Sequence, residues 1–540
     1  MSLKRLTHPN TLFLLILLAY LIYGGAFIFR TSTVVEESSF VPETKRYYVL
    51  FDDAMISLTY ARNFANGDGL VWWPDGPRVE GYTNPVWVLY MAFWHWIAIA
   101  DASKMSAVIQ ISGLVLLALN LVVVKKIAQR LSDSPLVMLG SVAFTAFYLP
   151  LNVWSLHGTE VSILTLFVSL ALWWVLKMLA EDRFIIWPYV LLAFSTSIRI
   201  DMAVPLLGIA GYMVLNDRAR WRQHMVIPVA LMLAFMAPQF AFRKWYYDDW
   251  LPNTYYLKMN GYPLVKRLTQ GYEVTGRFFM KVGFLPFAIL IFRRDRAIRL
   301  VTWVFVGQVL YSMYVGGDAW EWYGGANRYL AIAIPAFFVL LWLTLDAFYR
   351  WLMDASAALS ATNPRFRLQP NAARIGLALA AFTLLVNANY TYGTDALKEW
   401  LLIDKSMFAD EYNEKIQVSF LLEALTKPDA TITISAAGVV PYFTPREFVD
   451  ILGKNDTTIG RMDAVQDVLP EYVPGHMKWD YDYSVGELDP DVVFELWVHE
   501  EDAAIYLDNE YVRVWFPPAG RDVWMRTDSP NIYWDRIYGN

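Results

Sequence analysis

The sequence predicts a polytopic α-helical membrane protein with a smaller α/β domain at its C-terminal end. Hydrophobic residues make up 56% of the 540 residues and charged residues only 18%, too few charges to cover a soluble protein of this size. The 23 Trp and 32 Tyr residues suit the membrane–water interface. Apolar runs long enough to span a bilayer recur along most of the chain, and charge and turn residues increase after them.

About eleven apolar runs are predicted to span the membrane, each with charge confined to its ends. The two runs that flank Arg199 and Asp201 are short, which suits tilted or partly re-entrant helices. The first run has no small-residue cleavage site and is predicted to be a retained helix. The predicted spans are residues 11–29, 105–124, 136–151, 161–179, 184–198, 202–215, 225–242, 278–292, 300–315, 329–346 and 375–386.

The aromatic-rich segment 85–100 decides the predicted topology. Counted as a span, it would put Lys125, Lys126 and Arg130 outside and invert every later loop. Counted as a helix lying in the interface, it leaves Lys or Arg in every cytoplasmic loop, as the positive-inside rule expects. We therefore predict a multi-pass protein of the cytoplasmic (inner) membrane, with a cytoplasmic N-terminus and an extracytoplasmic C-terminal domain.

Two domains are predicted on this basis. Residues 1–391 form a transmembrane domain whose extracytoplasmic first loop, 30–104, carries juxtamembrane helices. Residues 392–540 form an extracytoplasmic α/β domain, with short β-like runs at 431–435, 491–498 and 511–516.

Composition and motifs exclude several classes of function. A net charge of −6 provides no basic patch for nucleic acid, and the chain has no Cys for disulfides or Cys-ligated zinc. The six His residues are scattered, and no nucleotide-binding glycine loop is present. A transporter is disfavoured because intramembrane charge is sparse and no inverted repeat is visible.

Two adjacent carboxylates, Asp52 and Asp53, precede an amphipathic helix in which Ile56, Tyr60 and Phe64 share a face. A helix N-cap would need only one of them. The pair suits a general base, a site for a divalent cation (Mg²⁺, Mn²⁺ or Ca²⁺), or both. Spacing alone leaves the structural and the catalytic interpretations open.

The other predicted outer loops carry further polar residues. Arg199 and Asp201 either pair with each other or form an anion site, because arginine binds phosphate bidentately. Lys258 lies on an outer loop against the positive-inside bias, which predicts an anionic partner. The remaining candidates are Glu80, Asn84, His157, Glu160, Asn253, Asp318 and Arg328.

Eight stretches together carry a family resemblance: DDAMISLTYARNFANGDGLVW, RVEGYTNPVW, HGTE, IRID, YYDDWLPNTYYLK, VGGDAWEWYGGANRYL, AAGVVPYFTPREFVDILGKND and GHMKWDYDY. In order and topology they resemble the GT-C class of polytopic glycosyltransferases, which use polyprenyl-phosphate sugars. The nearest similarity is to the mycobacterial terminal arabinofuranosyltransferases and their bacterial relatives.

The resemblance implies an inverting glycosyltransferase (EC 2.4 class) with a catalytic carboxylate at Asp52 or Asp53, which takes a proton from the acceptor hydroxyl. A divalent cation held by these two residues is the one cofactor it leaves open. For the donor phosphate it implies Arg199, Lys258 and Arg328. For the rest of the pocket it implies Glu80, Asn84 and Asn253, with His157, Glu160, Asp201 and Asp318 as further candidates.

The expected partners are a polyprenyl-phosphate sugar donor, a glycan, lipid or protein acceptor of the cell envelope, and the lipid bilayer. Nucleic acid is not expected. Arabinofuranose is the sugar that the nearest relatives imply. The alternative function is a non-catalytic membrane subunit or binding protein that retains the GT-C fold.

Overall fold

The computed structural model describes residues 8–319, 327–363, 365, 367–465 and 472–539. Within them, seven helices are long and apolar enough to cross a membrane, or nine spans if each of two bent helix pairs counts as one. The seven are α2 (Pro9–Thr31), α5 (Ala102–Leu131), α8 (Val161–Glu181), α11 (Trp221–Tyr246), α15 (Arg296–Val315), α17 (Ile334–Thr362) and α18 (Pro370–Asn389).

The bent pairs and two short helices account for the other predicted spans. One pair is α6 (Pro135–Ala146) with α7 (Leu149–Leu156), bent by 49°. The other joins α13 (Leu264–Val282) to η2 (Leu285–Ala288) and α14 (Ile289–Phe292), with a bend of 74°. The runs beside Arg199 form α9 (Trp187–Ser195), η1 (Ile200–Met202) and α10 (Ala203–Asn216). The prediction of a polytopic α-helical protein is confirmed, and the two predicted spans that flank Arg199 and Asp201 are the two short helices.

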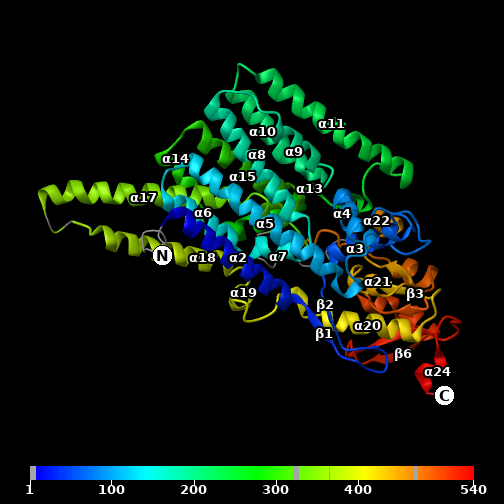
Figure 1. Ribbon diagram of the computed structural model, residues 1–540. Coiled ribbons are helices and arrows are strands. Elements are labelled where there is room, and N and C mark those ends of the chain that lie inside the picture. The colour runs from blue at the N-terminus through cyan, green and yellow to red at the C-terminus, as the bar shows by residue number, and fades with distance from the viewer. Residues whose placement is uncertain (1–7, 320–326, 364, 366, 466–471, 540) are drawn as a thin grey trace.

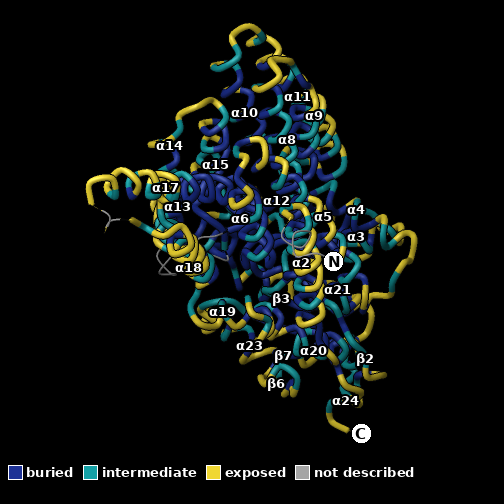
Figure 2. The backbone as a smooth tube through the Cα atoms, turned by 60° about the vertical axis from the view of Figure 1, so that its left-hand side comes forward, coloured by how far each residue is buried: buried dark blue, intermediate teal, exposed yellow. Residues whose placement is uncertain are grey.

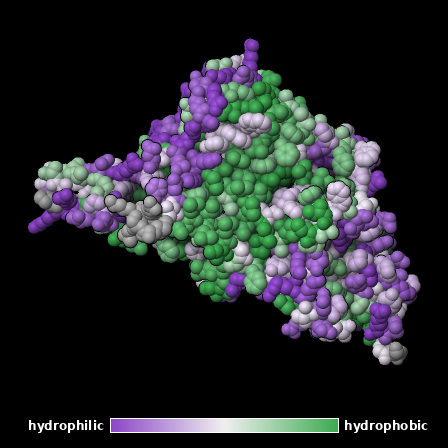
Figure 3. All heavy atoms as spheres, viewed as in Figure 1, coloured by the Kyte–Doolittle hydropathy of each residue, from purple (hydrophilic) through white to green (hydrophobic). Residues whose placement is uncertain are grey.

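The helices form one body, with a sheet-containing domain at one end (Figure 1). Within the body α5 packs against α2, α6 and α8. Gly140 of α6 allows close approach of α17, because a Cβ there would lie 2.0 Å from the Trp342 ring. The outer surfaces of α11 and α18 are largely exposed (Figure 2), and an apolar band covers the helical body between two hydrophilic ends (Figure 3). Such a band is the surface that lipid covers in a membrane protein.

The first loop forms a layer between the helical body and the sheet domain. It contains the hairpin β1 (Thr33–Val35) and β2 (Lys45–Tyr47), followed by α3 (Asp52–Asn66) and α4 (Pro85–Trp96), which pack against each other. The 12 residues of α4 extend only ~18 Å, too short for a hydrocarbon core of ~30 Å. Its length therefore agrees with the predicted interfacial helix.

On the predicted apolar face of α3, Ile56 and Tyr60 are buried, whereas Phe64 is 43% exposed. Phe64 instead borders an apolar groove shared with Leu89 and Phe93 of α4. The helix ends where Gly67 adopts a φ of 99°, a left-handed conformation that closes the last turn.

The C-terminal sheet has five strands in the order β4-β3-β5-β7-β6. Strand β3 pairs in parallel with β4 and β5, and β7 pairs antiparallel with β5 and β6. The predicted strands at 431–435 and 511–516 correspond to β3 and β6. The predicted run 491–498 forms a strand only at β5, and the sequence did not predict β4 and β7. The strands are β3 (Thr431–Ile434), β4 (Glu447–Asp450), β5 (Val492–Val493), β6 (Tyr511–Phe516) and β7 (Arg521–Arg526).

Short helices surround this sheet and connect it to the helical body. They are α19 (Thr394–Trp400), η5 (Met407–Ala409), α20 (Tyr412–Leu425), α21 (Val439–Phe443), α22 (Thr457–Arg461), η6 (Asp482–Glu487), η7 (Glu500–Ala503), α23 (Ala504–Glu510) and α24 (Trp534–Tyr538). Two more lie in loops of the helical body, α12 (Asn253–Met259) and α16 (Arg328–Ala331). Of these, α12 packs against α22 and α3 packs against α21, so the first loop and the sheet domain meet.

Candidate active site

The two carboxylates at the start of α3 have different partners. Phe51 occupies the N-cap position without a side-chain hydrogen bond, so neither carboxylate caps the helix. Asp52 accepts hydrogen bonds from the backbone N–H groups of Gly438 and Val439 in the sheet domain, each at 3.2 Å. Asp53 lines a cavity instead. The adjacent pair is therefore divided between an interdomain contact and the cavity.

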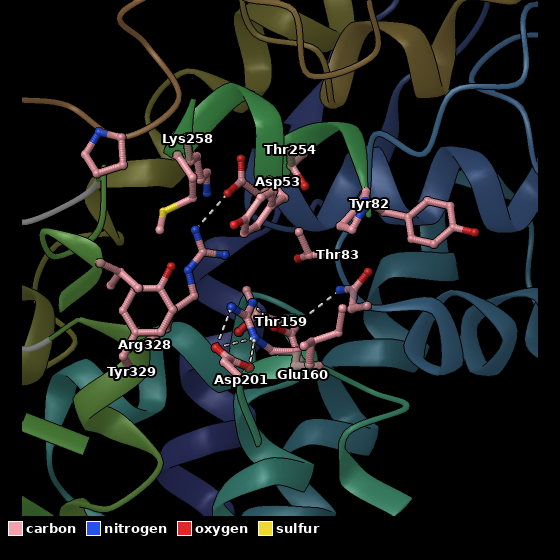
Figure 4. A pocket seen from close by; sticks show the side chains of 18 of the residues that line it. Asp53, Tyr82, Thr83, Thr159, Glu160, Asp201, Thr254, Lys258, Arg328 and Tyr329 are labelled. Carbon is pink, nitrogen blue, oxygen red and sulfur yellow. Dashed lines mark hydrogen bonds and ion pairs between the residues drawn. The ribbon is translucent and has the colours of Figure 1, made fainter. Parts of the chain in front are cut away.

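Asp53 lies between two cations. Its Oδ2 accepts a hydrogen bond from Arg328 Nη2 at 2.9 Å, and its Oδ1 lies 3.2 Å from Lys454 Nζ (Figure 4 shows the Arg328 contact). Burial raises the pKa of Asp53, but the charges of Lys454, Arg328 and Lys258 outweigh it and hold the pKa far below the usual range. Arg328 also pairs with the buried Asp318 through both carboxylate oxygens. Asp53 is thus an ionised carboxylate at neutral pH.

Lys258 of α12 gives this cluster an excess of positive charge. Its side chain lines the cavity, and burial together with the nearby Arg328 lowers its pKa to about 8. At neutral pH the three cations Lys258, Arg328 and Lys454 face the two carboxylates of Asp53 and Asp318. A partly buried cluster with one unbalanced positive charge is a site for an anion such as phosphate.

A second ionic group lines the opposite part of the cavity. Arg199 donates to Glu160 Oε1 at 2.7 Å and to both oxygens of Asp201 at 2.9–3.2 Å. Asn84 donates to the other oxygen of Glu160 at 2.8 Å, and the Arg199 guanidinium lies 5.5 Å from the centre of the Tyr329 ring. Arg199 is therefore paired with two carboxylates, and this group carries a net negative charge.

The cavity has a volume of about 390 Å³, within the range of small-molecule sites. Besides the two ionic groups, it has an apolar wall formed by Val204 of α10, Tyr311 and Tyr314 of α15, and Leu251 and Met259. Tyr314 is 48% exposed, so this wall reaches the outer surface of the protein. A ligand with a charged head and an apolar tail would match the two parts of the cavity.

Seven of the twelve predicted site residues line this cavity, and five do not. Those that line it are Asp53, Asn84, Glu160, Arg199, Asp201, Lys258 and Arg328. Asp52 contacts the sheet domain and Asp318 supports Arg328. Glu80 forms a buried ion pair with Arg243 of α11, with distances of 2.6 and 3.0 Å. Glu80 therefore connects the first loop to the helical body.

His157 and Asn253 also lie outside the cavity lining. His157 is buried between Phe27 and Phe408, and its Nδ1 is 3.3 Å from the Tyr412 hydroxyl. The amide of Asn253 donates to backbone carbonyls of the segment 453–456. Both residues hold parts of the chain together around the site.

Most of the other lining residues were not predicted, and three of them bear on the site's chemistry: Lys454, Tyr311 and Tyr329. The two tyrosines are indistinguishable in sequence from the many aromatic residues of the spans. Lys454 lies 401 residues from Asp53, in a stretch ILGKND that resembled the family without marking the lysine. Loops at strand ends often carry functional residues, but this signal was not available because β4, the strand before Lys454, was not predicted.

The arrangement does not fit the divalent cation that the sequence left open as a ligand of Asp52 and Asp53. The Asp52 carboxylate faces backbone N–H groups, and both oxygens of Asp53 face cations. In the part of the chain that the structure describes, no three His, Cys, Asp or Glu side chains are grouped closely enough to hold a metal ion.

Comparison with known proteins places the fold. A family model described as a domain of unknown function (DUF8728) matches residues 405–530. No curated protein matches the chain. A crystal structure of ArnT from Cupriavidus metallidurans bound to undecaprenyl phosphate is similar with a TM-score of 0.54 and 14% identity, over 96% of this chain and 98% of that one.

Archaeal oligosaccharyltransferase structures are similar as well. The Archaeoglobus fulgidus enzyme in its apo form has a TM-score of 0.51 and 12% identity, over 96% of this chain and 75% of that one. AglB from the same organism, in complex with an inhibitory peptide and a dolichol-phosphate, has a TM-score of 0.51 and 11% identity over the same shares. The protein therefore has the GT-C fold, with a C-terminal domain that contains a sheet.

Proposed function

We propose that this protein is an inverting glycosyltransferase that transfers a sugar from a polyprenyl-phosphate carrier to an acceptor. One observation carries the proposal: in a GT-C fold, the cavity places the Asp53 carboxylate beside Lys258 and Arg328, and an apolar wall continues from this cluster. Two proteins of the same fold were solved with undecaprenyl phosphate and dolichol-phosphate, which supports a lipid phosphate as the ligand here.

The reaction is a single displacement at the anomeric carbon. The acceptor oxygen bonds to this carbon while the bond from the carbon to the phosphate oxygen breaks, and that bond's electron pair stays on the phosphate. Asp53 receives the proton of the acceptor hydroxyl. Lys258 and Arg328 stabilise the negative charge that develops on the phosphate in the transition state. Such electrostatic stabilisation is usually the largest contribution to lowering the activation barrier in an enzyme.

The second ionic group suits the sugar better than the phosphate. The charge of Arg199 is already balanced by Glu160 and Asp201, so a phosphate there would meet a net negative group. Carboxylate oxygens accept hydrogen bonds from hydroxyl groups, and the Asn84 amide holds Glu160 in place. We assign the phosphate to the Lys258 side of the cavity and the sugar hydroxyls to the Glu160 side.

We further propose arabinofuranose as the sugar and a cell-envelope glycan, lipid or protein as the acceptor. The eight sequence stretches similar to arabinofuranosyltransferases support this choice. The same proposal puts the protein in the cytoplasmic membrane with the N-terminus inside and the cavity on the outer face. The alternating basic loops support this orientation.

The test combines deletion of the gene with assays of the purified protein. Mass spectrometry of surface glycans should show the loss of one sugar residue after deletion. Purified protein in lipid nanodiscs should then transfer the same sugar from a defined polyprenyl-phosphate donor, with arabinofuranose and a hexopyranose compared. Unchanged glycans, together with donor binding but no transfer, would favour the non-catalytic alternative.

A further inference from the structure

The sheet domain supplies one of the three cations around Asp53. Lys454 follows β4, its side chain is only 8% exposed, and it lines the cavity with its Nζ 3.2 Å from Asp53 Oδ1. Lys258 and Arg328 both come from the helical body. The domain matched by a family of unknown function therefore contributes a charged group to the candidate active site.

The backbone on both sides of Lys454 is fixed to the helical body. The Asn253 amide donates to three backbone carbonyls of the segment 453–456 at 2.9–3.1 Å. The Tyr60 hydroxyl of α3 donates to Asn455 Oδ1 at 3.0 Å. A cation that served only as a surface counterion would need no such support, since exposed ion pairs contribute little to the stability of the folded protein.

The segment is also braced from within the sheet domain. The buried Asp450 carboxylate accepts hydrogen bonds from the backbone N–H groups of Leu452 and Asn455 and from the Asn455 side chain, at 2.8–3.1 Å. Gly453 has a φ of 71°, and a Cβ there would lie 2.6 Å from Ile459. The turn that carries Lys454 therefore depends on a conformation and a space that glycine provides.

A second interdomain contact lies beside the first. Asp52 binds the backbone N–H groups of Gly438 and Val439, and a Cβ on Gly438 would lie 2.1 Å from the Asp52 carbonyl oxygen. The first contact involves Asn253 of α12 and Tyr60 of α3, and the second involves Asp52, the residue before Asp53. Together the two contacts fix the sheet domain in a position that brings Lys454 to Asp53. They provide the rigid support that a reacting group requires.

We propose that Lys454 is a catalytic residue that pairs with Asp53 before transfer and binds the leaving phosphate as Asp53 takes the acceptor proton. This inference rests on the proposed glycosyl transfer. An ammonium group has three N–H donors, of which Asp53 receives one. Lys454 is therefore able to contact Asp53 and a phosphate oxygen in the same cavity.

The charges balance through this step. Before transfer Asp53 carries one negative charge and the phosphodiester of the donor carries one. After transfer Asp53 is protonated and neutral, and the polyprenyl phosphate monoester carries two. The negative charge has moved from Asp53 to the phosphate. The cations paired with Asp53 therefore lose their ionised partner at the same step in which the leaving phosphate gains charge. Arg328 keeps Asp318 as a partner, whereas Lys454 is released.

The first measurement is the affinity of the full-length protein for undecaprenyl phosphate in nanodiscs. Lys454→Met should weaken this binding about tenfold and change the affinity for the sugar-loaded donor less than about threefold, because the diester carries less charge. The matched control is Lys427→Met, an exposed lysine of the same domain, which should bind both ligands as the wild type does.

A double-mutant cycle separates this role from a structural one. Asp53→Asn removes the competing carboxylate, so it should tighten binding of undecaprenyl phosphate about fivefold or more. Adding Lys454→Met should cancel most of that gain. If Lys454 only held the domains together, Lys454→Met would lower the melting temperature of both the wild type and Asp53→Asn. The effects of the two substitutions on undecaprenyl phosphate binding would then be independent.

The transfer rate completes the test. Lys454→Met should lower the rate by about 10²–10³, and Lys454→Arg should restore part of it. Wild-type binding and rate in Lys454→Met would overturn the role of Lys454 and leave the proposed function intact. A wild-type protein that binds undecaprenyl phosphate but transfers no sugar would overturn the proposed function, and the binding cycle would still decide the phosphate contact. If the wild type binds no polyprenyl phosphate, both proposals are wrong.

Discussion

Asp52 and Asp53 are neighbours in sequence, yet the structure predicts different results when each is changed. Asp53→Asn should lower the transfer rate by about 10²–10⁴, because the amide cannot take the acceptor proton. Asp52→Asn should retain most of the activity, since its side-chain oxygen can still accept the N–H groups of Gly438 and Val439. Initial rates with a polyprenyl-phosphate donor measure both effects.

Asp52→Ala serves as the companion variant. It removes the acceptor for two backbone N–H groups and should lower the melting temperature, as the loss of buried hydrogen bonds does. Equal losses of rate in Asp52→Asn and Asp53→Asn, at unchanged melting temperatures, would contradict the division of roles.

Lys258 makes donor binding depend on pH. Its pKa is lowered to about 8, so the ammonium loses its proton as the pH rises through 8 and the cluster loses its excess positive charge. Affinity for the donor should therefore be full below about pH 7 and fall above pH 8. Lys258→Arg should bind the donor with little change between pH 7 and pH 9, because arginine stays charged. Donor affinity in nanodiscs is measured as a function of pH for the wild type and for Lys258→Arg. An identical pH profile in the two proteins would refute the role of Lys258.

At the level of residues, the sequence predicted most of the charged groups that line the cavity but few of its other lining residues. Asp53 stood out as one of two adjacent carboxylates, Lys258 as a cation on an outer loop against the positive-inside bias, and Arg328 through the family resemblance. Sequence could not show which of the two adjacent aspartates faces the cavity, since that depends on where the sheet domain docks. Lys454 was missed for the same reason.

At the scale of the elements, the buried pair of Glu80 and Arg243 fixes the first loop to α11. Both side chains are almost fully buried, and the guanidinium donates to both carboxylate oxygens. Glu80→Ala should destabilise the protein by about 3–5 kcal/mol, because it leaves a buried charge without its partner. Thermal unfolding in detergent would show this as a lower melting temperature.

An exposed ion pair of the same loop provides the control. Glu43 and Lys45 are 3.5 Å apart with side chains 66% and 30% exposed, so Glu43→Ala should change stability by less than about 1 kcal/mol. Similar melting temperatures for Glu80→Ala and Glu43→Ala would mean that the buried pair is not structural.

Elements with a strong periodic or apolar signal were predicted best. The long apolar helices follow from apolar length, which is a local property of the chain. The strands β4 and β7 were missed because β4 has only four residues and β7 has only three apolar residues, flanked by charged residues at both ends. Their place in the sheet is set by pairing with distant strands, which no local pattern encodes.

At the scale of the whole molecule, the end that carries the sheet domain is predicted to face the cell exterior. The chain contains no Cys, so single cysteines introduced at exposed positions can be labelled without background. A membrane-impermeant maleimide applied to intact cells should label Asp68→Cys and Asp528→Cys, and should leave Asp133→Cys and Arg218→Cys unlabelled until the cells are lysed. All four positions are exposed.

The four positions distinguish the two topologies because they respond differently to α4. Asp68 precedes α4 and is outside in either case, so it is the positive control. If α4 spanned the membrane, every later loop would invert, and Asp133 and Arg218 would label in intact cells while Asp528 would not. That pattern would place Asp53 and Lys454 on opposite sides of the bilayer, which their separation of 3.2 Å between Oδ1 and Nζ forbids. The ion pair across the domain junction therefore requires that α4 does not span the membrane, and the labelling experiment tests this prediction.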